Sequence, residues 1–123
     1  MTILTALDQA YKTRPTAAHK SILTDQLMRG LEGEVAAMFG MDPPEYEFVV
    51  PEPPDVQEDL ELLMPYPYDD IYLWYLCAQI DLANEETQLY ENDMEVFNAA
   101  WARAQAWYRR ETRKFDKRNW KVM

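Results

Sequence analysis

The side chains that most often carry catalysis are scarce in this chain. It contains one histidine, His19, and one cysteine, Cys77. A zinc site needs several such ligands and a nucleophile needs a base within hydrogen-bonding reach, so neither chemistry has its residues here. The glycines, Gly30, Gly33 and Gly40, are too far apart to form a phosphate-binding loop. We therefore expect no catalytic residue, no cofactor and no enzymatic activity, and we expect Cys77 to be a small buried hydrophobe.

Acidic side chains offer the remaining route to a bound metal. Asp81 and Glu85 stand four residues apart, and Glu86 follows directly. Carboxylates at this spacing share one face of a helix. Helical bundles that bind two metal ions add Glu-x-x-His motifs, which this chain lacks. We therefore favour a solvated acidic face over a metal site.

Charge is distributed unevenly along the 123 residues, whose formal net charge is −10. Residues 1–30 carry four basic and two acidic side chains, residues 31–98 carry eighteen acidic and no basic ones, and residues 99–123 carry eight basic and two acidic ones. Two electrostatic poles of this kind are typical of an interaction surface more than of a substrate pocket, although ordinary solvated faces are the alternative. The acidic body argues against binding along duplex DNA, because phosphates require Lys and Arg.

Apolar residues recur at helical spacing over most of the chain and predict an all-α fold. Four helices are expected near residues 2–12, 16–39, 69–90 and 93–112, the last two packed as an antiparallel hairpin. The clearest stripe has steps of three and four residues and comprises Met94, Phe97, Trp101, Ala104 and Tyr108. We expect this stripe to be core. Gly30 and Gly33 are poor helix formers within the second helix, where they indicate a bend or the close approach of another helix.

Capping residues and helix breakers set the expected limits of these helices. Thr2 can cap the first helix, Pro15 ends it and Gly40 stops the second. The residues expected to begin the last two helices are Asp69 and Asp70, then Asn92 and Asp93. We expect one helical domain over residues 1–112, followed by a basic tail over residues 113–123.

Residues 41–67 form an acidic segment that holds seven of the eight prolines. Proline fixes φ and lacks an N–H group, so no long helix can form there. A short β-hairpin over residues 46–64 or an extended arm would fit, and we expect the arm to pack on a neighbouring subunit or a partner. Its contact residues are expected to be Tyr46, Phe48, Val49, Leu62 and Leu63.

The basic C-terminal end combines positive charge with isolated aromatic residues. Aromatic side chains on an exposed tail often anchor a partner, and a disordered terminus is the alternative. The expected docking residues are Arg110, Arg113, Lys114, Phe115, Lys117, Arg118, Trp120 and Lys121. No stretch approaches the roughly 18 apolar residues of a transmembrane helix, and residues 1–7 do not form a signal peptide, so we expect a soluble protein made in the cytoplasm.

Several short motifs resemble small virion proteins of tailed bacteriophages and of prophages in Gram-positive bacteria. The matching residues are Leu62, Leu63, Pro65, Pro67, Tyr68 and Asp69, then Tyr72, Tyr75 and Leu76, then Ile80, Asp81, Ala83 and Asn84, and finally Trp107, Tyr108 and Arg109. Arg14 and Pro15 between the first two helices also fit. Proteins of this kind look like head–tail connector (adaptor) proteins of the phage neck. They commonly have Gly-Glu after the Asn, whereas Glu85 and Glu86 stand here, so a continued helix can replace the usual turn.

The resemblance implies a helical protein that assembles as a homo-oligomeric ring beneath the portal, contacts neighbouring neck or tail proteins and is located in the virion. In such a ring, acidic side chains would repel the phosphates of passing DNA. The expected channel or rim residues are Glu85, Glu86, Glu91, Asp93 and Glu95. The alternative function is a small phage-encoded inhibitor whose acidic surface mimics nucleic acid.

Overall fold

In the computed structural model, the described backbone covers residues 1–14, 20–42 and 61–122, and the described side chains are those of the same ranges without 20–21 and 113–122. Within these ranges the chain is all-α and contains no strand. The helices are α1 (Ile3–Thr13), α2 (Lys20–Gln26), the π-helix η1 (Leu27–Glu32), α3 (Gly33–Met38), α4 (Asp70–Ala83) and α5 (Thr87–Val122). The all-α prediction is confirmed.

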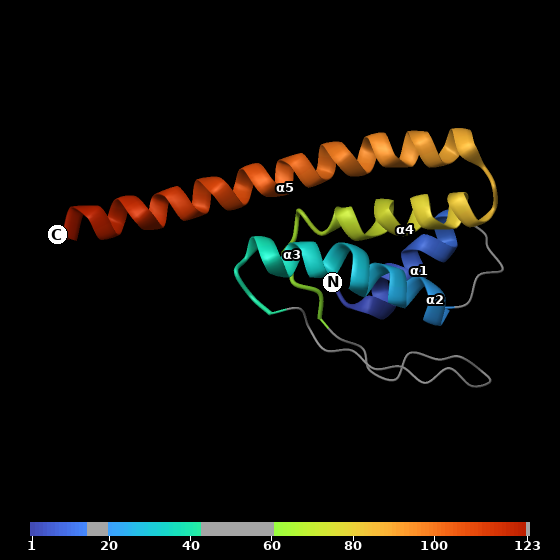
Figure 1. Ribbon diagram of the computed structural model, residues 1–123, viewed down its shortest axis with the longest axis horizontal. Coiled ribbons are helices and arrows are strands. Elements are labelled where there is room, and N and C mark those ends of the chain that lie inside the picture. Colours follow the sequence, from blue (N-terminus) through green and yellow to red (C-terminus); the bar gives the residue numbers. More distant parts are fainter. Residues whose placement is uncertain (15–19, 43–60, 123) are drawn as a thin grey trace.

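Helix α4 occupies the middle of the bundle (Figure 1). It packs against α5 on one side and against α1, α2 and η1 on the other. The α4 and α5 helices run in opposite directions, as the predicted hairpin requires. Because α4 is enclosed, its buried residues do not follow one narrow stripe. They are Ile71, Tyr72, Leu76, Cys77, Ala78, Ile80 and Asp81.

Helix α1 has the expected limits. The Thr2 hydroxyl accepts a hydrogen bond from the Thr5 backbone N–H at 3.2 Å, which caps the N-terminus. Arg14, which precedes Pro15, is extended at φ −133° and ψ 106°, and the helix ends at Thr13. The buried face of α1 is formed by Ile3, Ala6, Leu7 and Ala10.

The α2, η1 and α3 segments follow one another without a break, and the π segment lies where the two internal glycines occur. A Cβ atom added to Gly30 would lie 2.2 Å from the Tyr75 Oη atom, so this glycine permits the close approach of α4. The Tyr75 hydroxyl donates to the Gln26 carbonyl at 3.2 Å, where the normal i→i+4 pattern gives way to the wider π-helix. The predicted close approach is therefore confirmed at Gly30.

Gly40 ends this helical segment with φ +69°. Its N–H donates to the Ala37 carbonyl, and the Met41 N–H donates to the Ala36 carbonyl. This pair of bonds is the Schellman motif, in which a left-handed residue closes the last helical turn. The predicted helix stop at Gly40 is confirmed.

The described part of the chain resumes at Glu61. Residues 61–64, which we call the returning segment, begin beside the N-terminus. Glu61 and Thr2 form an isolated antiparallel bridge, and the Leu62 N–H donates to the Met1 carbonyl at 2.9 Å. The partner that we expected for this stretch, residues 46–50, lies outside the described residues. Leu62 and Met64 are buried in the core.

The boundary between α4 and α5 differs from the prediction, which placed it near residues 90–93. Helix α4 ends at Ala83, and α5 begins at Thr87. Glu85 has φ +60°, its N–H donates to the Leu82 carbonyl, and the Glu86 N–H donates to the Asp81 carbonyl. This is a second Schellman motif with a glutamate in the left-handed position. The expectation of a continued helix at Glu85 was therefore wrong.

Helix α5 carries the predicted apolar stripe. Phe97 and Ala104 are buried, whereas Met94, Trp101 and Tyr108 are only partly buried. Near the end of the stripe, the Trp107 ring stacks on Tyr68 at a centroid distance of 5.2 Å. Phe39 contacts both Trp107 and Tyr108. This aromatic cluster joins α5 to the end of α3 and to the turn before α4.

Beyond the aromatic cluster, α5 leaves the bundle and projects past it (Figure 1). We call residues 109–122 of this helix the overhang. The helix continues to Val122, so the expected change from helix to tail near residue 112 is wrong for the backbone. None of the helices in the described ranges combines the length and apolar character needed to cross a membrane.

The strained turn at Glu85 leads to a first prediction. A left-handed conformation costs a non-glycine residue about 1 kcal/mol, so Glu85→Gly should stabilise the fold by about that amount. Glu86→Gly is the matched control, because it removes the same side chain from a neighbouring position without positive φ. Chemical denaturation should show a gain for Glu85→Gly only. Equal effects of the two changes would contradict a strained Glu85.

Candidate functional site

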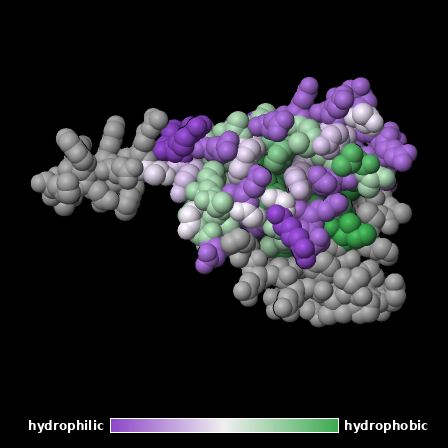
Figure 2. Space-filling model, in the orientation of Figure 1, coloured by the Kyte–Doolittle hydropathy of each residue, from purple (hydrophilic) through white to green (hydrophobic). Residues whose placement is uncertain are grey.

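The overhang of α5 carries the predicted docking residues, and among them only the side chain of Arg110 is described. Arg109 and Arg110 are exposed, and neither has an ion-pair partner among the described residues. Figure 2 shows strongly hydrophilic residues at the place where α5 leaves the bundle. The side chains of the remaining docking residues lie outside the described ones. They are Arg113, Lys114, Phe115, Lys117, Arg118, Trp120 and Lys121.

The predicted channel or rim residues divide into two groups. Glu85, Glu86, Glu91 and Glu95 are exposed, and they form no ion pair with any described residue. Asp93 is different, because only 2% of it is exposed. It lies in the face of α5 that packs on α4 and cannot line a solvent-filled channel. The assignment of Asp93 to a rim was therefore wrong.

Asp93 belongs to a buried cluster with Arg14 and Asp81. The Arg14 Nε atom lies 3.3 Å from Asp81 Oδ2, and its Nη2 atom lies 3.0 Å from Asp93 Oδ1. Arg14 stands at the C-cap of α1, Asp81 in the last turn of α4 and Asp93 in α5. One guanidinium thus connects three helices. The sequence patterns indicated Asp81 as a candidate metal ligand and both Asp81 and Arg14 as motif residues, but they did not predict that the two side chains pair.

The cluster places two carboxylates against a single cation. Burial raises the pKa of Asp93 to about 6, and the neighbouring Asp81 carboxylate adds to this effect, while Arg14 opposes it. Burial alone would lower the pKa of Arg14, but Asp93 and Asp81 raise it overall. The buried Asp93 Oδ2 atom has no hydrogen-bond partner among the described residues. A proton on Asp93 would allow its carboxyl group to hydrogen-bond to Asp81 and would remove the excess negative charge.

Cys77 lies in α4 beside this cluster and is fully buried, as expected. Burial raises the pKa of its thiol to about 11, and Asp93 contributes in the same direction. A thiol held in its neutral form is a poor nucleophile. The position of Cys77 therefore fits a packing role.

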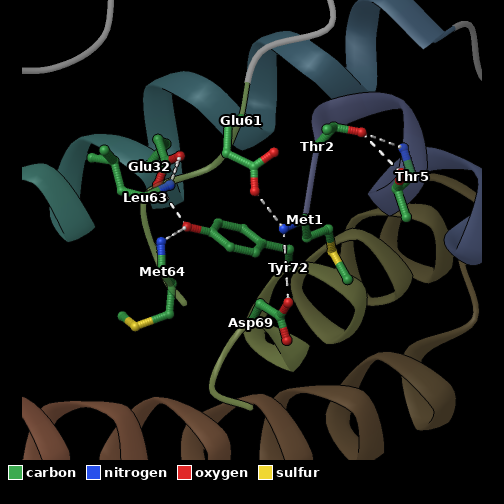
Figure 3. Close-up of polar contacts among 9 residues, drawn as sticks. All are labelled: Met1, Thr2, Thr5, Glu32, Glu61, Leu63, Met64, Asp69 and Tyr72. Atoms are coloured by element: carbon green, nitrogen blue, oxygen red, sulfur yellow. Dashed lines mark hydrogen bonds and ion pairs between the residues drawn. The ribbon is translucent and has the colours of Figure 1, made fainter. Parts of the chain in front are cut away.

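A second buried polar cluster connects the returning segment to the helices (Figure 3). The Glu32 carboxylate, fully buried at the end of η1, accepts from the Tyr72 hydroxyl at 2.8 Å and from the Leu63 N–H at 2.9 Å. The Tyr72 oxygen in turn accepts from the Met64 N–H at 2.9 Å. Burial raises the pKa of Glu32, although both hydrogen bonds oppose this shift. Burial and the Glu32 carboxylate likewise raise the pKa of Tyr72.

The sequence contained a weak signal for Glu32. Two buried rows with steps of four residues run along this helical segment. One is apolar and consists of Leu23, Leu27, Leu31 and Val35, and the other, which contains Glu32, consists of Thr24, Met28, Glu32 and Ala36. Because this row mixes polar and apolar residues, it does not stand out as a hydrophobic face. The partners of Glu32 come from residues 63 and 72, far along the chain.

The predicted arm residues also divide into two groups. Tyr46, Phe48 and Val49 lie outside the described residues. Leu62 is buried in the core of its own chain, and Leu63 is partly buried against that core. Leu62 therefore cannot contact a neighbouring subunit in this conformation, which corrects its assignment to an interface. Leu62 and Leu63 attach the end of the arm to the bundle.

Metal binding has no support from the geometry of the described side chains, among which no group of three or more His, Cys, Asp or Glu could hold an ion. Asp81, the one acid considered for such a role that is buried, faces Arg14. Comparisons with protein families, with curated proteins and with solved structures gave no match to this chain. Its charge pattern and exposed helix therefore carry the functional argument.

The Arg14 cluster predicts a pH-dependent contribution to stability. The pKa of Asp93 is higher in the folded protein, about 6, than its ordinary value of 3.8, so the folded state binds the proton more tightly. The stabilisation is fully present below about pH 4 and is lost as the pH rises through about 6. Asp93→Asn, which mimics the protonated acid, should remove this dependence. The free-energy difference between variant and wild type should shift in favour of the variant by about 1 kcal/mol from pH 5 to pH 8.

Denaturant titrations at both pH values measure this shift. Glu95→Gln is the matched control, because it neutralises an exposed carboxylate on the same helix. The change in Asp93→Asn should exceed that in Glu95→Gln. A constant difference between Asp93→Asn and wild type at the two pH values would contradict the assignment.

The Glu32 cluster predicts a specific role for the Tyr72 hydroxyl. Tyr72→Phe leaves the Glu32 Oε1 atom and the Met64 N–H without this partner in a buried site, and should destabilise the fold by about 1–3 kcal/mol. Tyr68→Phe is the control, since Tyr68 contributes its ring to the stack on Trp107. Hydrogen exchange at the Leu63 and Met64 amides should accelerate in Tyr72→Phe only. Equal effects of the two variants would argue against the polar cluster.

Proposed function

We propose that this protein is a structural virion component of a tailed bacteriophage, a head–tail connector (neck adaptor) without enzymatic activity. In this proposal it assembles as a homo-oligomeric ring at the portal and forms part of the channel through which DNA passes. Its partners are further copies of itself, the portal and neighbouring neck or tail proteins. The short motifs shared with such proteins suggest this context.

The observation that carries the proposal is the projection of α5 beyond the bundle. Seven basic residues lie between positions 109 and 121 of this helix, against two acidic ones. They extend from a body whose residues 31–98 contain no Lys or Arg. A charged helix that leaves its own core is suited to docking on a surface of opposite charge. Among the described side chains, the core contacts of α5 end at Tyr108.

The acidic surface fits the task of a channel. Glu85, Glu86, Glu91 and Glu95 are exposed near the start of α5, and like charges repel the phosphates of passing DNA. A connector must let DNA through without binding it. The proposal assigns these glutamates to the channel or its rim, and it assigns the proline-rich segment 41–67 to an arm that packs on a neighbouring subunit or a partner.

Removal of residues 113–123 tests the docking role of the overhang. The shortened chain should stay folded, with thermal unfolding close to that of the full chain, because the described core contacts end at Tyr108. It should no longer co-sediment with portal-bearing, tailless phage heads. Co-sedimentation of the full chain should weaken when the salt concentration is raised, since charge pairs are screened.

Trp120→Ala and Lys117→Ala compare the contribution of the aromatic anchor to docking with the contribution of a single positive charge. Trp120→Ala should weaken docking more than Lys117→Ala, because buried aromatic anchors set the lifetime of a complex and rim charges mainly tune its rate of formation. Undiminished docking by the shortened chain would exclude the overhang as the docking element. A full chain that stays monomeric and does not bind phage heads would instead favour the alternative function, a small inhibitor whose acidic surface mimics nucleic acid.

A further inference from the structure

One face of α5 has no partner within the described chain. Among the described helices, α5 packs mainly against α4, with further contacts from Arg14 and Phe39. The opposite side of α5 carries exposed residues at helical spacing, namely Glu91, Glu95, Ala102 and Arg109. We call this side the outward face. In Figure 1 no other helix lies beside α5 on the side away from α4.

The character of this face changes along the helix. Its first part, which we call the acidic half, carries Glu91 and Glu95, with Glu85 and Glu86 just before it. Ala99 and Ala102 are exposed in the middle, where small side chains allow another helix to approach closely. The last described part carries Arg109 and Arg110, and the sequence continues with five further basic residues to Lys121.

The two charged parts cannot meet within one molecule. Both lie on a single continuous helix of 36 residues, which is about 54 Å long. The basic part of the overhang, residues 109–121, spans roughly 18 Å of this helix, and the acidic half, from Thr87 to Glu95, spans roughly 12 Å. An isolated helix as short as the overhang is marginal in water. A surface of opposite charge on another molecule would stabilise it.

We propose that the basic overhang of α5 in one copy packs on the acidic half of α5 in a second copy of this chain. The inference rests on the proposed function in one respect: the connector proposal makes the overhang a docking element, and the inference names a second copy of the chain as its partner. Glu91 and Glu95 then face the neighbouring copy, and Glu85 and Glu86 remain available for the rim.

Reciprocal charge reversal tests this contact without phage heads. The acidic-half variant carries Glu91→Lys and Glu95→Lys, and the overhang variant carries Arg109→Glu and Arg110→Glu. Each variant alone opposes like charges in the contact, so its self-association should be at least about tenfold weaker than that of the wild type. An equimolar mixture restores opposite charges at every contact, so association should return. Sedimentation velocity over a range of concentrations at low and high salt measures all four samples.

The control carries Glu34→Lys and Asp42→Lys, which change the net charge as the acidic-half variant does but at exposed positions outside α5. It should associate like the wild type. Circular dichroism and thermal unfolding establish that every variant is folded. The inference is overturned if the wild type stays monomeric, if the single variants associate normally, or if the mixture of folded variants stays dissociated.

The same measurements separate this inference from the connector. Restored association in the form of a closed dimer would support the contact and contradict a ring. A wild type that stays monomeric in solution, yet co-sediments with portal-bearing heads through the overhang, would overturn the inference and leave the connector standing. Charge-dependent self-association of the wild type without any binding to phage heads would support the inference and contradict the connector.

Discussion

Helix α4 is enclosed by the rest of the bundle, so each polar group that it carries into the interior needs a partner from another part of the chain. Tyr72 near its start meets Glu32, and Asp81 near its end meets Arg14. An unpaired polar group in either place would lose its hydration without compensation. These two contacts tie η1, the returning segment and the C-terminal end of α1 to the same central helix. The arrangement of the bundle follows from them as much as from apolar packing.

The position of α5 depends on one of these polar contacts and on the aromatic cluster. Near its start, Asp93 shares Arg14 with Asp81, and near the end of its packed part the Trp107 and Tyr108 rings contact Phe39 and Tyr68. Attachment at both ends of the packed region fixes the direction in which the overhang leaves the bundle. The positive residues therefore project from a defined place, which suits a docking element better than a flexible tail would.

The separation of charge has consequences for assembly. Opposite charges at the two ends of one helix cannot neutralise each other within the molecule, so they favour contacts between molecules. Contacts of this kind respond to ionic strength and to charge reversal, whereas the apolar core does not. An acidic body also limits non-specific binding to nucleic acid, because phosphates repel carboxylates.

Much of the local structure follows from the sequence. The all-α class, the cap at Thr2, the end of α1 before Pro15, the stop at Gly40 and the buried Cys77 all depend on neighbouring residues or on simple periodicity. The unequal distribution of charge is likewise a property of the sequence alone. These features could be predicted because their causes lie within a few positions of each other.

Only the tertiary structure decided which polar residues are buried and where the last two helices divide. Asp93 looks like any acid near a helix start, but packing on α4 buries it against Arg14, which is 79 residues away. Glu85 has no intrinsic preference for a left-handed turn, and it takes one because α5 must reverse direction to cover α4. Burial and reversal are set by contacts between distant segments, and such contacts leave no periodic signal in the sequence.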